Sequence, residues 1–505
     1  MQKPEIVLDI LRNRSENNLK VMNVHKLLYN PDFYTKFTKL SNENITSIIS
    51  SLRAESYKFG NNLEVDKELY NVIFQILDSI YSSRFKQSLQ YKVHTALTRV
   101  RQKGKACEFF IHSKLLDTSK IPFKVLINFM NEVIDDQRFL TLLRKLLIAC
   151  KFDKCINIDD AFSGTIKFNN DLFTLLYNIY LYQFDLYIEN TLVSKYNYGE
   201  TRKRNIKYNR LKNQILDHST RFTSKKDKLN DEEKHNKIQK LKNLRKQYRT
   251  LNCREPIEND DSFRRLSYTR YSNEWLITFT GTFQEAMQIK EDILKFYDES
   301  LELHNQSVTI HKSNDKKHVV RFLNYGIITQ WDNDKLTNGK KCLGGEIGFL
   351  VPKEIVLTYT KPYLKDKKPI HINRLVNKNL YDIITYFQMQ LRGLLQYYKF
   401  ARNQDSLTIF RHTLEVSLIK TIACKYKTSC SKVYKKYGSH CIVNGFKYKT
   451  IEGSITTKDG LVKHVHFGAI PLKRQIALNT HPIVDSKSFY NYNAHSYENL
   501  KRSIP

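Results

Sequence analysis

The sequence predicts an α+β protein that is helical over most of its length, with strands near its middle. Gly and Pro are scarce, at 16 and 10 in 505 residues, which favours helices over an all-β sandwich or barrel. Apolar residues recur at helical spacing over long stretches. Residues 266–327 instead predict strand, turn, strand, helix and two further strands.

The first 200 residues predict mainly helices. An amphipathic pattern over Asp66–Ser83 predicts one helix, and further helices are expected at Phe123–Val133 and Arg138–Cys150. The segment Asp171–Leu192 is unusually apolar, so we expect this helix to be largely buried. Between the helices, Glu108–Ile111 is a short strand candidate.

The segment 201–250 changes character. It contains 17 Lys or Arg residues and five acidic residues, and it has few apolar positions. We interpret it as a basic insertion, partly helical and partly disordered. It would add affinity for a polyanion through counterion release, and the alternative is a solvated linker without a contact role.

The charge of the whole chain narrows the class of partner. There are 83 Lys or Arg residues against 51 Asp or Glu residues, a formal net charge of +32. A surplus of this size favours a polyanionic partner. No apolar run reaches the roughly 18 residues that a membrane-spanning helix needs, so we expect no membrane contact. We also expect no small-molecule substrate.

Cysteines and the N-terminus indicate a reducing compartment. The eight cysteines form no Cys-x-x-Cys pair and fit no zinc site, which predicts reduced thiols. The N-terminus has neither a secretory apolar region nor a transit-peptide composition. Abundant Lys, Asn, Ile and Tyr are typical of AT-rich coding DNA and suggest a protein made inside an organelle. His464 and His466 lack a third ligand, so we interpret them as surface histidines.

Several segments occur in the order of one known family. Residues 268–279 read Tyr-Thr-Arg-Tyr-Ser-Asn-Glu-Trp-Leu-Ile-Thr-Phe, which resembles the Tyr-x-Arg-Tyr-Ala-Asp-Asp-Phe-Leu-Ile-Gly-Phe of reverse transcriptases of the group II intron type. Upstream, Leu175–Asp185 resembles that family's Leu-Leu-Ala-Asn-Ile-Tyr-Leu-His-Glu-Leu-Asp helix. Downstream, segments within 392–438 resemble domain X, the thumb-like RNA-binding domain of maturases. The chain therefore resembles an organellar group II intron maturase up to about residue 450.

The resemblance implies a right-hand, reverse-transcriptase-like fold with degenerate fingers and palm, followed by an α-helical thumb or domain X. The implied domains are an N-terminal helical region with reduced fingers at 1–106, the first part of the palm at 107–195, the basic insertion at 196–258, the second part of the palm at 259–350, the thumb or domain X at 351–450, and a C-terminal tail at 451–505.

The metal-binding positions of this family are altered here. The resemblance places its aspartates at Ile111, Asn273 and Glu274. Nucleotidyl transfer requires carboxylates that hold two metal ions, and a single acid cannot hold the pair. We therefore expect no catalytic residue, no protein-bound metal and no cofactor, with Mg²⁺ held by the intron RNA. We interpret Glu274 as a solvated or Lys-paired residue at a hairpin tip.

The C-terminal region carries the predicted RNA contacts. Leu414, Leu418 and Ile422 recur every four residues and predict a helix core face, and Lys425, Lys432 and Lys436 would share an exposed face if the helix continued. Lysines track phosphates, and interleaved tyrosines can stack on unpaired bases; the alternative is a solvated face with core tyrosines. The predicted RNA-binding residues are Lys420, Lys425, Lys427, Lys432, Lys435, Lys436, Arg392, Tyr398, Arg202, Lys203 and Arg204.

The expected function is that of a maturase that binds group II intron RNA and promotes splicing by stabilising the active RNA fold, with reverse transcription lost. A residual RNA-directed DNA polymerase that supports intron mobility and a general organellar RNA-binding protein are the alternatives. The expected partner is group II intron RNA, with a homodimer or nuclear-encoded splicing factors as further partners. The plastid is the expected compartment, and the mitochondrion is the alternative.

Overall fold

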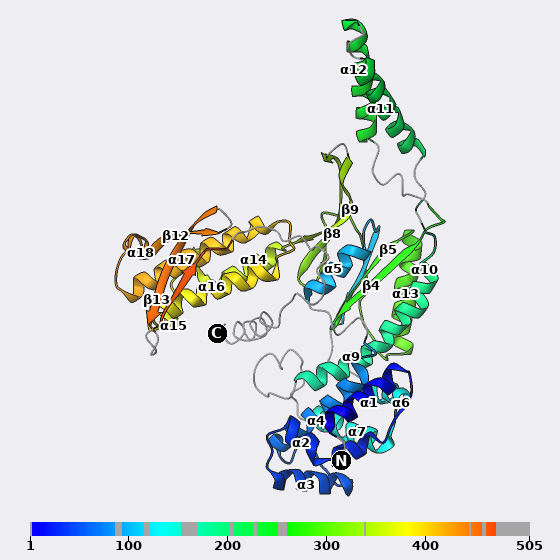
Figure 1. Ribbon diagram of the computed structural model, residues 1–505, viewed down its shortest axis with the longest axis vertical. Coiled ribbons are helices and arrows are strands. Elements are labelled where there is room, and N and C mark those ends of the chain that lie inside the picture. Colours follow the sequence, from blue (N-terminus) through cyan, green and yellow to red (C-terminus); the bar gives the residue numbers. More distant parts are fainter. Residues whose placement is uncertain are drawn as a thin grey trace. The chain divides into compact units, whose positions relative to one another are not determined.

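The computed structural model describes residues 3–85, 93–115, 122–152, 170–200, 202, 206–225, 230–250, 260–337, 340–443, 446–456 and 461–470 (Figure 1). The chain divides into two compact units. Unit 1 consists of Met1–His318 with Thr329–Ile347, and unit 2 consists of Val319–Ile328 with Gly348–Pro505. Within the described ranges, no helix is long and apolar enough to cross a membrane.

Unit 1 begins with a helical layer. Its helices pack around α4, which contacts α1, α2 and α9. Ile73, Ile76 and Leu77 of α4 are fully buried, as the amphipathic pattern predicts. The elements of this layer are α1 (Pro4–Glu16), β1 (Val21–Met22), a 3₁₀ helix (Val24–Tyr29), α2 (Pro31–Phe37), α3 (Asn42–Arg53), α4 (Leu63–Tyr81), α6 (Phe123–Val133), β3 (Ile134–Asp135) and α7 (Gln137–Phe152).

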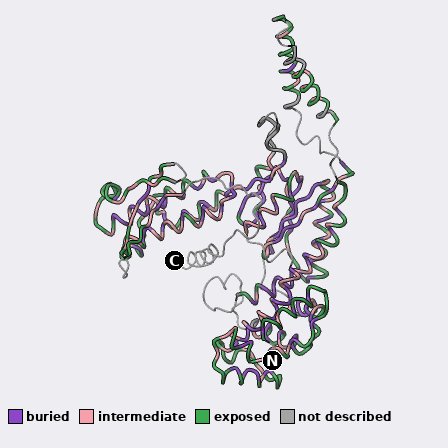
Figure 2. The backbone as a smooth tube through the Cα atoms, viewed as in Figure 1, coloured by how far each residue is buried: buried purple, intermediate pink, exposed green. Residues whose placement is uncertain are grey.

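A sheet with the strand order β4-β5-β2-β6 forms the centre of unit 1. The neighbouring strands of this sheet are antiparallel, and much of the sheet is buried (Figure 2). Helices α9 and α13 share a hydrophobic core with the sheet, and α5 contacts β4. These elements are α5 (Val93–Lys103), β2 (Phe109–Lys114), α9 (Asn170–Tyr187), a π-helical turn (Ile188–Leu192), α10 (Val193–Tyr196), β4 (Arg265–Tyr271), β5 (Glu274–Thr280), α13 (Phe283–Glu299) and β6 (Thr309–Lys312).

Helices α11 (Ile206–Lys225) and α12 (Asp231–Thr250) contact each other and form the helical part of the basic segment. Leu241 is buried, whereas Leu216 and Ile238 are exposed. Few apolar contacts therefore hold the two helices, which agrees with the low apolar content of this stretch.

Unit 2 contains a helical layer against a small antiparallel sheet. The sheet has the order β12-β13-β14, and α16 contacts both β13 and β14. Gly453 permits this approach, because a Cβ atom there would lie 2.7 Å from Ile384 Cδ1. The elements are α14 (Lys353–Thr360), a 3₁₀ turn (Lys361–Tyr363), β10 (Leu364–Lys365), β11 (Lys368–Pro369), α15 (Asn373–Val376), α16 (Leu380–Tyr397), a 3₁₀ turn (Gln404–Leu407), α17 (Thr408–Lys425), α18 (Cys430–Tyr437), β12 (Gly438–Val443), β13 (Phe446–Thr456) and β14 (Val462–Phe467).

Three strands lie where the chain passes between the units. They are β7 (Val320–Phe322), β8 (Tyr325–Thr337) and β9 (Lys340–Leu350), in the order β7-β8-β9. Tyr325 belongs to unit 2, and within that unit its ring lies against Tyr397 and Tyr398, with ring centroids 5.8 and 4.9 Å apart.

The expectation of an α-helical domain at 351–450 needs correction. Strand β12 and the first half of β13 lie inside that range, so the helices of unit 2 are completed by a sheet. The sequence carries a signal for it: Asn444-Gly445 separates Val443 from Phe446, which pair across the hairpin. An Asn-Gly pair between alternating residues is a strong hairpin signal. The mixed α and β class is confirmed, and the right-hand arrangement of fingers and palm stays a prediction.

Candidate nucleic-acid interface

The hairpin between β4 and β5 carries two of the three altered metal positions, Asn273 and Glu274, and both of these side chains have a partner. The Asn273 side chain donates to the Leu115 carbonyl at 3.0 Å, and the Leu115 backbone amide donates to the Asn273 carbonyl at 2.9 Å. Glu274 Oε1 lies 3.1 Å from His112 Nε2. These contacts attach the hairpin tip to β2, which is a structural role.

Ile111 lies away from that tip. It pairs with Ile277, whereas Glu274 pairs with Lys114 three residues further along β2. Because side chains alternate between the two faces of a strand, Ile111 and Glu274 project from opposite faces. Ile111 is fully buried in the hydrophobic core. The structure therefore does not bring Ile111 and Glu274 together.

These residues do not fit a pair of Mg²⁺ ions. Two-metal sites require several hard oxygen ligands, mostly carboxylates. The hairpin offers one carboxylate, already beside His112, and an amide that donates its hydrogen to a carbonyl. Across the part of the chain that the structure describes, no group of three or more His, Cys, Asp or Glu residues could hold a metal ion.

Helix α17 has the core face that its spacing predicts. Leu414, Leu418 and Ile422 are fully buried. The helix ends at Lys425, and Lys427 adopts a left-handed φ of 48°. A separate helix, α18, begins at Cys430 after its N-cap Ser429. The lysines of 420–436 therefore lie on two helices and a turn, and the face of one continuous helix is not formed.

Two of the predicted lysines bind the protein itself. Lys420 Nζ donates to the Pro369 carbonyl at 2.8 Å, and Lys425 Nζ donates to the Val376 carbonyl at 3.1 Å. The two ammonium groups thereby attach β11 and α15 to α17. Their hydrogen bonds indicate a packing role, although both side chains remain half-exposed.

The remaining lysines form an exposed group that we call the lysine surface. Lys432 and Lys436 are one helical turn apart on α18, Lys435 is beside them, and Lys427 lies in the preceding turn; all four are exposed. Val433 is buried beneath them and fixes the orientation of α18. Four exposed ammonium groups of this kind are suited to contact phosphates.

Aromatic rings accompany these lysines. Tyr426 and Tyr437, which we call the tyrosine pair, are stacked with centroids 6.0 Å apart and planes inclined by 26°. Lys425 lies over the Tyr426 ring and Lys436 over the Tyr437 ring, at 5.8 and 5.3 Å. Tyr426 is 44% exposed, so an unpaired base could reach its ring.

Tyr434 is also partly exposed, and its hydroxyl donates to Glu415 at 2.5 Å. Burial and this hydrogen bond both raise the pKa of Tyr434. Glu415, an acidic residue of α17, therefore accepts a hydrogen bond from Tyr434 of α18.

The other predicted contact residues differ in exposure. Arg392 is exposed on α16. Tyr398 is 1% exposed, and its hydroxyl donates to the Asn324 carbonyl at 3.0 Å; this side chain completes the core and offers no ring surface for stacking. Arg202 lies 3.5 Å from Glu108 and over the Phe263 ring at 5.4 Å. Lys203 and Arg204 lie outside the described residues.

Two lysines of β13 were not among the predicted contacts. Lys447 and Lys449 are both exposed, and they project from the same face because they are two residues apart in a strand. Helix α18 contacts β13, which brings this strand to the helix that carries the lysine surface. The alternation in Phe-Lys-Tyr-Lys-Thr-Ile at 446–451 is the signal that could have indicated them.

Comparison with known proteins identifies a family match that lies almost entirely within unit 2. Residues 347–469, most of the described part of unit 2, match the family model "Type II intron maturase". The chain is 27% identical over 410 residues to the group II intron-encoded protein LtrA of Lactococcus lactis, which covers 77% of this chain and 65% of LtrA. The match thus spans less than two thirds of that relative.

Two further relatives carry intron or maturase names. The putative COX1/OXI3 intron 2 protein of Saccharomyces cerevisiae is 29% identical over 393 residues, which is 73% of this chain and 43% of that protein. Maturase K of Marchantia polymorpha is 24% identical over 360 residues, which is 68% of this chain and 88% of that protein. The family model and these relatives support the resemblance to group II intron maturases that the sequence motifs indicate.

Proposed function

We propose that this protein binds group II intron RNA and promotes its splicing by stabilising the catalytically active RNA fold. The observation that carries the proposal is the exposed lysine surface beside the tyrosine pair, inside the region that matches the maturase model. Lysines supply affinity for phosphates, and an exposed ring accepts an unpaired base. Differential affinity for the active RNA conformer would shift the RNA population towards it.

We propose further that the chain does not copy RNA and needs no cofactor of its own. The supporting residues are Asn273 and Glu274, which are attached to β2 by hydrogen bonds, and Ile111, which is buried. The intron RNA would hold the Mg²⁺ and supply the splicing chemistry.

Loss of the protein tests the main proposal. Deletion of the gene, followed by sequencing of organellar transcripts, should show one or a few group II introns that stay unspliced. Crosslinking of the protein to RNA should recover the same introns. Reads dispersed over many unrelated transcripts would instead establish a general RNA-binding protein.

Primer extension tests the polymerase alternative. The purified chain, an RNA template, a DNA primer and Mg²⁺ or Mn²⁺ should give no extended product. Incorporation that Glu274→Ala abolishes, while Glu291→Ala leaves it unchanged, would establish a working polymerase and refute the second proposal.

The plastid is our proposed compartment, on the strength of the organellar amino-acid composition, with the mitochondrion as the alternative. Fractionation of the source cells with an antibody against the chain separates the two. A homodimer and nuclear-encoded splicing factors stay predictions about its partners.

A further inference from the structure

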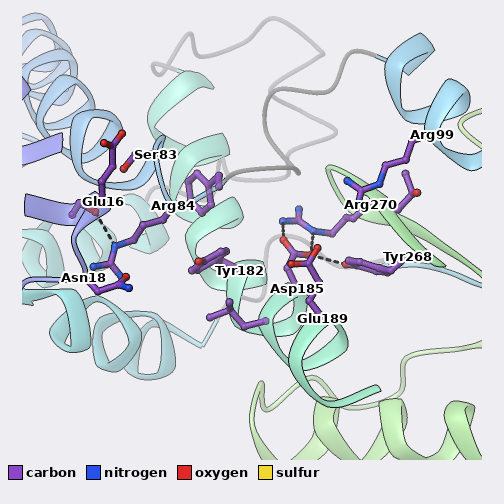
Figure 3. A pocket seen from close by; sticks show the side chains of 14 residues that line it. Glu16, Asn18, Ser83, Arg84, Arg99, Tyr182, Asp185, Glu189, Tyr268 and Arg270 are labelled. Carbon is purple, nitrogen blue, oxygen red and sulfur yellow. Dashed lines mark hydrogen bonds and ion pairs between the residues drawn. The ribbon is translucent and has the colours of Figure 1, made fainter. Parts of the chain in front are cut away.

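A pocket of about 350 Å³ lies in unit 1 among the ends of α1 and α4, helix α5, the α9 helix with its π-helical turn, and strand β4 (Figure 3). Its lining combines charged side chains with aromatic rings. The proposed RNA contacts of unit 2 do not use it, and neither does the β4–β5 hairpin tip. Its chemistry therefore needs a separate explanation.

One side of the pocket is fixed by Arg84. Its Nε atom donates to Ser15 Oγ at 2.8 Å, and Ser15 Oγ in turn donates to the Ile80 carbonyl. Ser15 is fully buried, so this chain of hydrogen bonds holds the guanidinium in one orientation. Arg84 is one of the residues that line the pocket.

The other side carries Glu189, in the π-helical turn Ile188–Leu192. Such turns are rare and occur frequently at functional sites. Burial and the nearby Asp185 raise the pKa of Glu189 above its ordinary value, and Arg99 and Lys103 offset this only in part. Asp185 itself is committed to Arg270 and Tyr268, which leaves Glu189 as the carboxylate on this side.

The charges of the pocket balance. Its lining holds as many arginines as acidic residues: Arg84, Arg99 and Arg270 against Glu16, Asp185 and Glu189. A free anion gains little from a site without net positive charge. A neutral, planar group with hydrogen-bond acceptors on one edge and donors on the other fits better. In Figure 3, Arg84 and Glu189 lie on opposite sides, and the Tyr182 ring lies between them.

We propose that this pocket binds an unpaired guanine base of the bound RNA, which rests on the proposed function. Guanine O6 and N7 accept hydrogen bonds from arginine, which matches Arg84. Its N1–H and exocyclic amine donate together to a carboxylate, which matches Glu189. The base would stack on Tyr182, whose ring is half-buried. Adenine would bind more weakly, because its N1 atom is an acceptor and cannot donate to Glu189. A pyrimidine would also bind more weakly, because it lacks the N7 atom that accepts from arginine.

Titration calorimetry on the full chain tests this, with GMP and AMP as probes because both carry the same phosphate. GMP should bind saturably at one site per chain, and AMP about tenfold more weakly. Glu189→Gln should weaken GMP binding about tenfold, because the glutamine oxygen can accept from one guanine donor while its NH2 group opposes the other. The matched control Glu291→Gln, at an exposed position of α13 outside the pocket, should leave it unchanged.

Tyr182→Leu provides a second variant, which should weaken both nucleotides through lost stacking. Absence of saturable GMP binding, equal affinity for AMP, or unchanged binding by folded Glu189→Gln overturns the inference. Intron RNA binding is measured separately. If it persists while GMP fails to bind, only the pocket assignment fails; if intron RNA does not bind, the proposed function fails whatever GMP does.

Discussion

Arg270 and Asp185 form a two-point ion pair, with Nη2 2.5 Å from Oδ2 and Nε 2.8 Å from Oδ1. Tyr268 donates to the same carboxylate at 2.6 Å, and Arg270 Nη1 donates to Asn178 and to the Ser272 carbonyl, both at 3.0 Å. The pair joins α9 to the β4–β5 hairpin. The Arg of the Tyr-x-Arg-Tyr motif therefore has a structural reason to be present that does not depend on catalysis.

Asp185→Ala should destabilise unit 1 strongly. The Arg270 side chain is fully buried, and removal of one partner leaves an uncompensated buried charge, a cost of about 3–5 kcal/mol. Urea unfolding followed by tryptophan fluorescence measures it, since Trp275 is buried nearby. Glu299→Gln, which breaks an exposed pair with Lys295, should cost less than about 1 kcal/mol. Equal losses in the two variants would contradict the assignment.

The pair of His25 and Asp136 should make unit 1 sensitive to acid. Burial raises the pKa of Asp136, but hydrogen bonds from the backbone and ring of His25 and from the Phe139 amide outweigh it, so the pKa is lowered overall. A lowered carboxyl pKa contributes stability above its ordinary value of 3.8, and that stability is lost as the pH falls through the folded-state pKa.

Asp136→Asn should therefore cost about 2 kcal/mol at neutral pH and lose less stability than the wild type when the pH falls below about 4. Urea midpoints measured across this range provide the test. Asp135→Asn is the matched control, because Asp135 is the adjacent residue and its side chain is exposed. If both variants keep the wild-type acid dependence, the pair does not set it.

Lys432→Ala with Lys436→Ala should weaken intron RNA binding and flatten its salt dependence. Each lost phosphate contact lowers the slope of log K against log salt by about 0.7–0.9, so two contacts lower it by about 1.4–1.8. Filter binding at several salt concentrations measures the slope. The control Lys316→Ala with Lys317→Ala removes two exposed charges from unit 1, and it should leave the slope closer to the wild-type value.

The sequence predicts the helices with long apolar faces well. The expected helix at Phe123–Val133 has those bounds in the structure, and the buried face of α17 is confirmed at Leu414 and Leu418. The predicted continuous lysine face fails because periodicity alone does not show a helix end. The left-handed turn at Lys427 interrupts the helix and directs the lysines of α17 and α18 differently.

Tertiary contacts explain what the pattern could not show at the candidate site. The sequence pattern predicts that Lys420 and Lys425 are surface lysines. In the structure, backbone carbonyls of β11 and α15, more than 40 residues away in sequence, accept their hydrogen bonds. Tyr398 reads as a stacking residue until Asn324 is found against its hydroxyl. In each case the side chain donates to a backbone carbonyl of a segment that is distant in sequence, and local residue spacing cannot predict such a contact.

Asn273→Ala should have a small effect on splicing. Its side chain makes one hydrogen bond, to the Leu115 carbonyl, so the loss should be about 1 kcal/mol of stability and little activity. Splicing of the target intron in vitro, at a temperature well below the unfolding midpoint, measures this. A large splicing defect in the folded variant would show that the hairpin tip contacts RNA.

Tyr426→Ala should weaken binding of intron RNA more than its stability cost explains. The ring is 44% exposed and stacks on Tyr437, and a base stacked on an aromatic ring contributes about 1–3 kcal/mol. Tyr426→Phe keeps the ring and removes the hydroxyl, so it should bind as the wild type does. Dissociation constants for the three proteins, measured at one salt concentration, separate stacking from hydrogen bonding. If the phenylalanine variant binds as weakly as the alanine variant, the hydroxyl makes the contact and the stacking role of the tyrosine pair is wrong; if neither variant changes binding, RNA does not reach this ring.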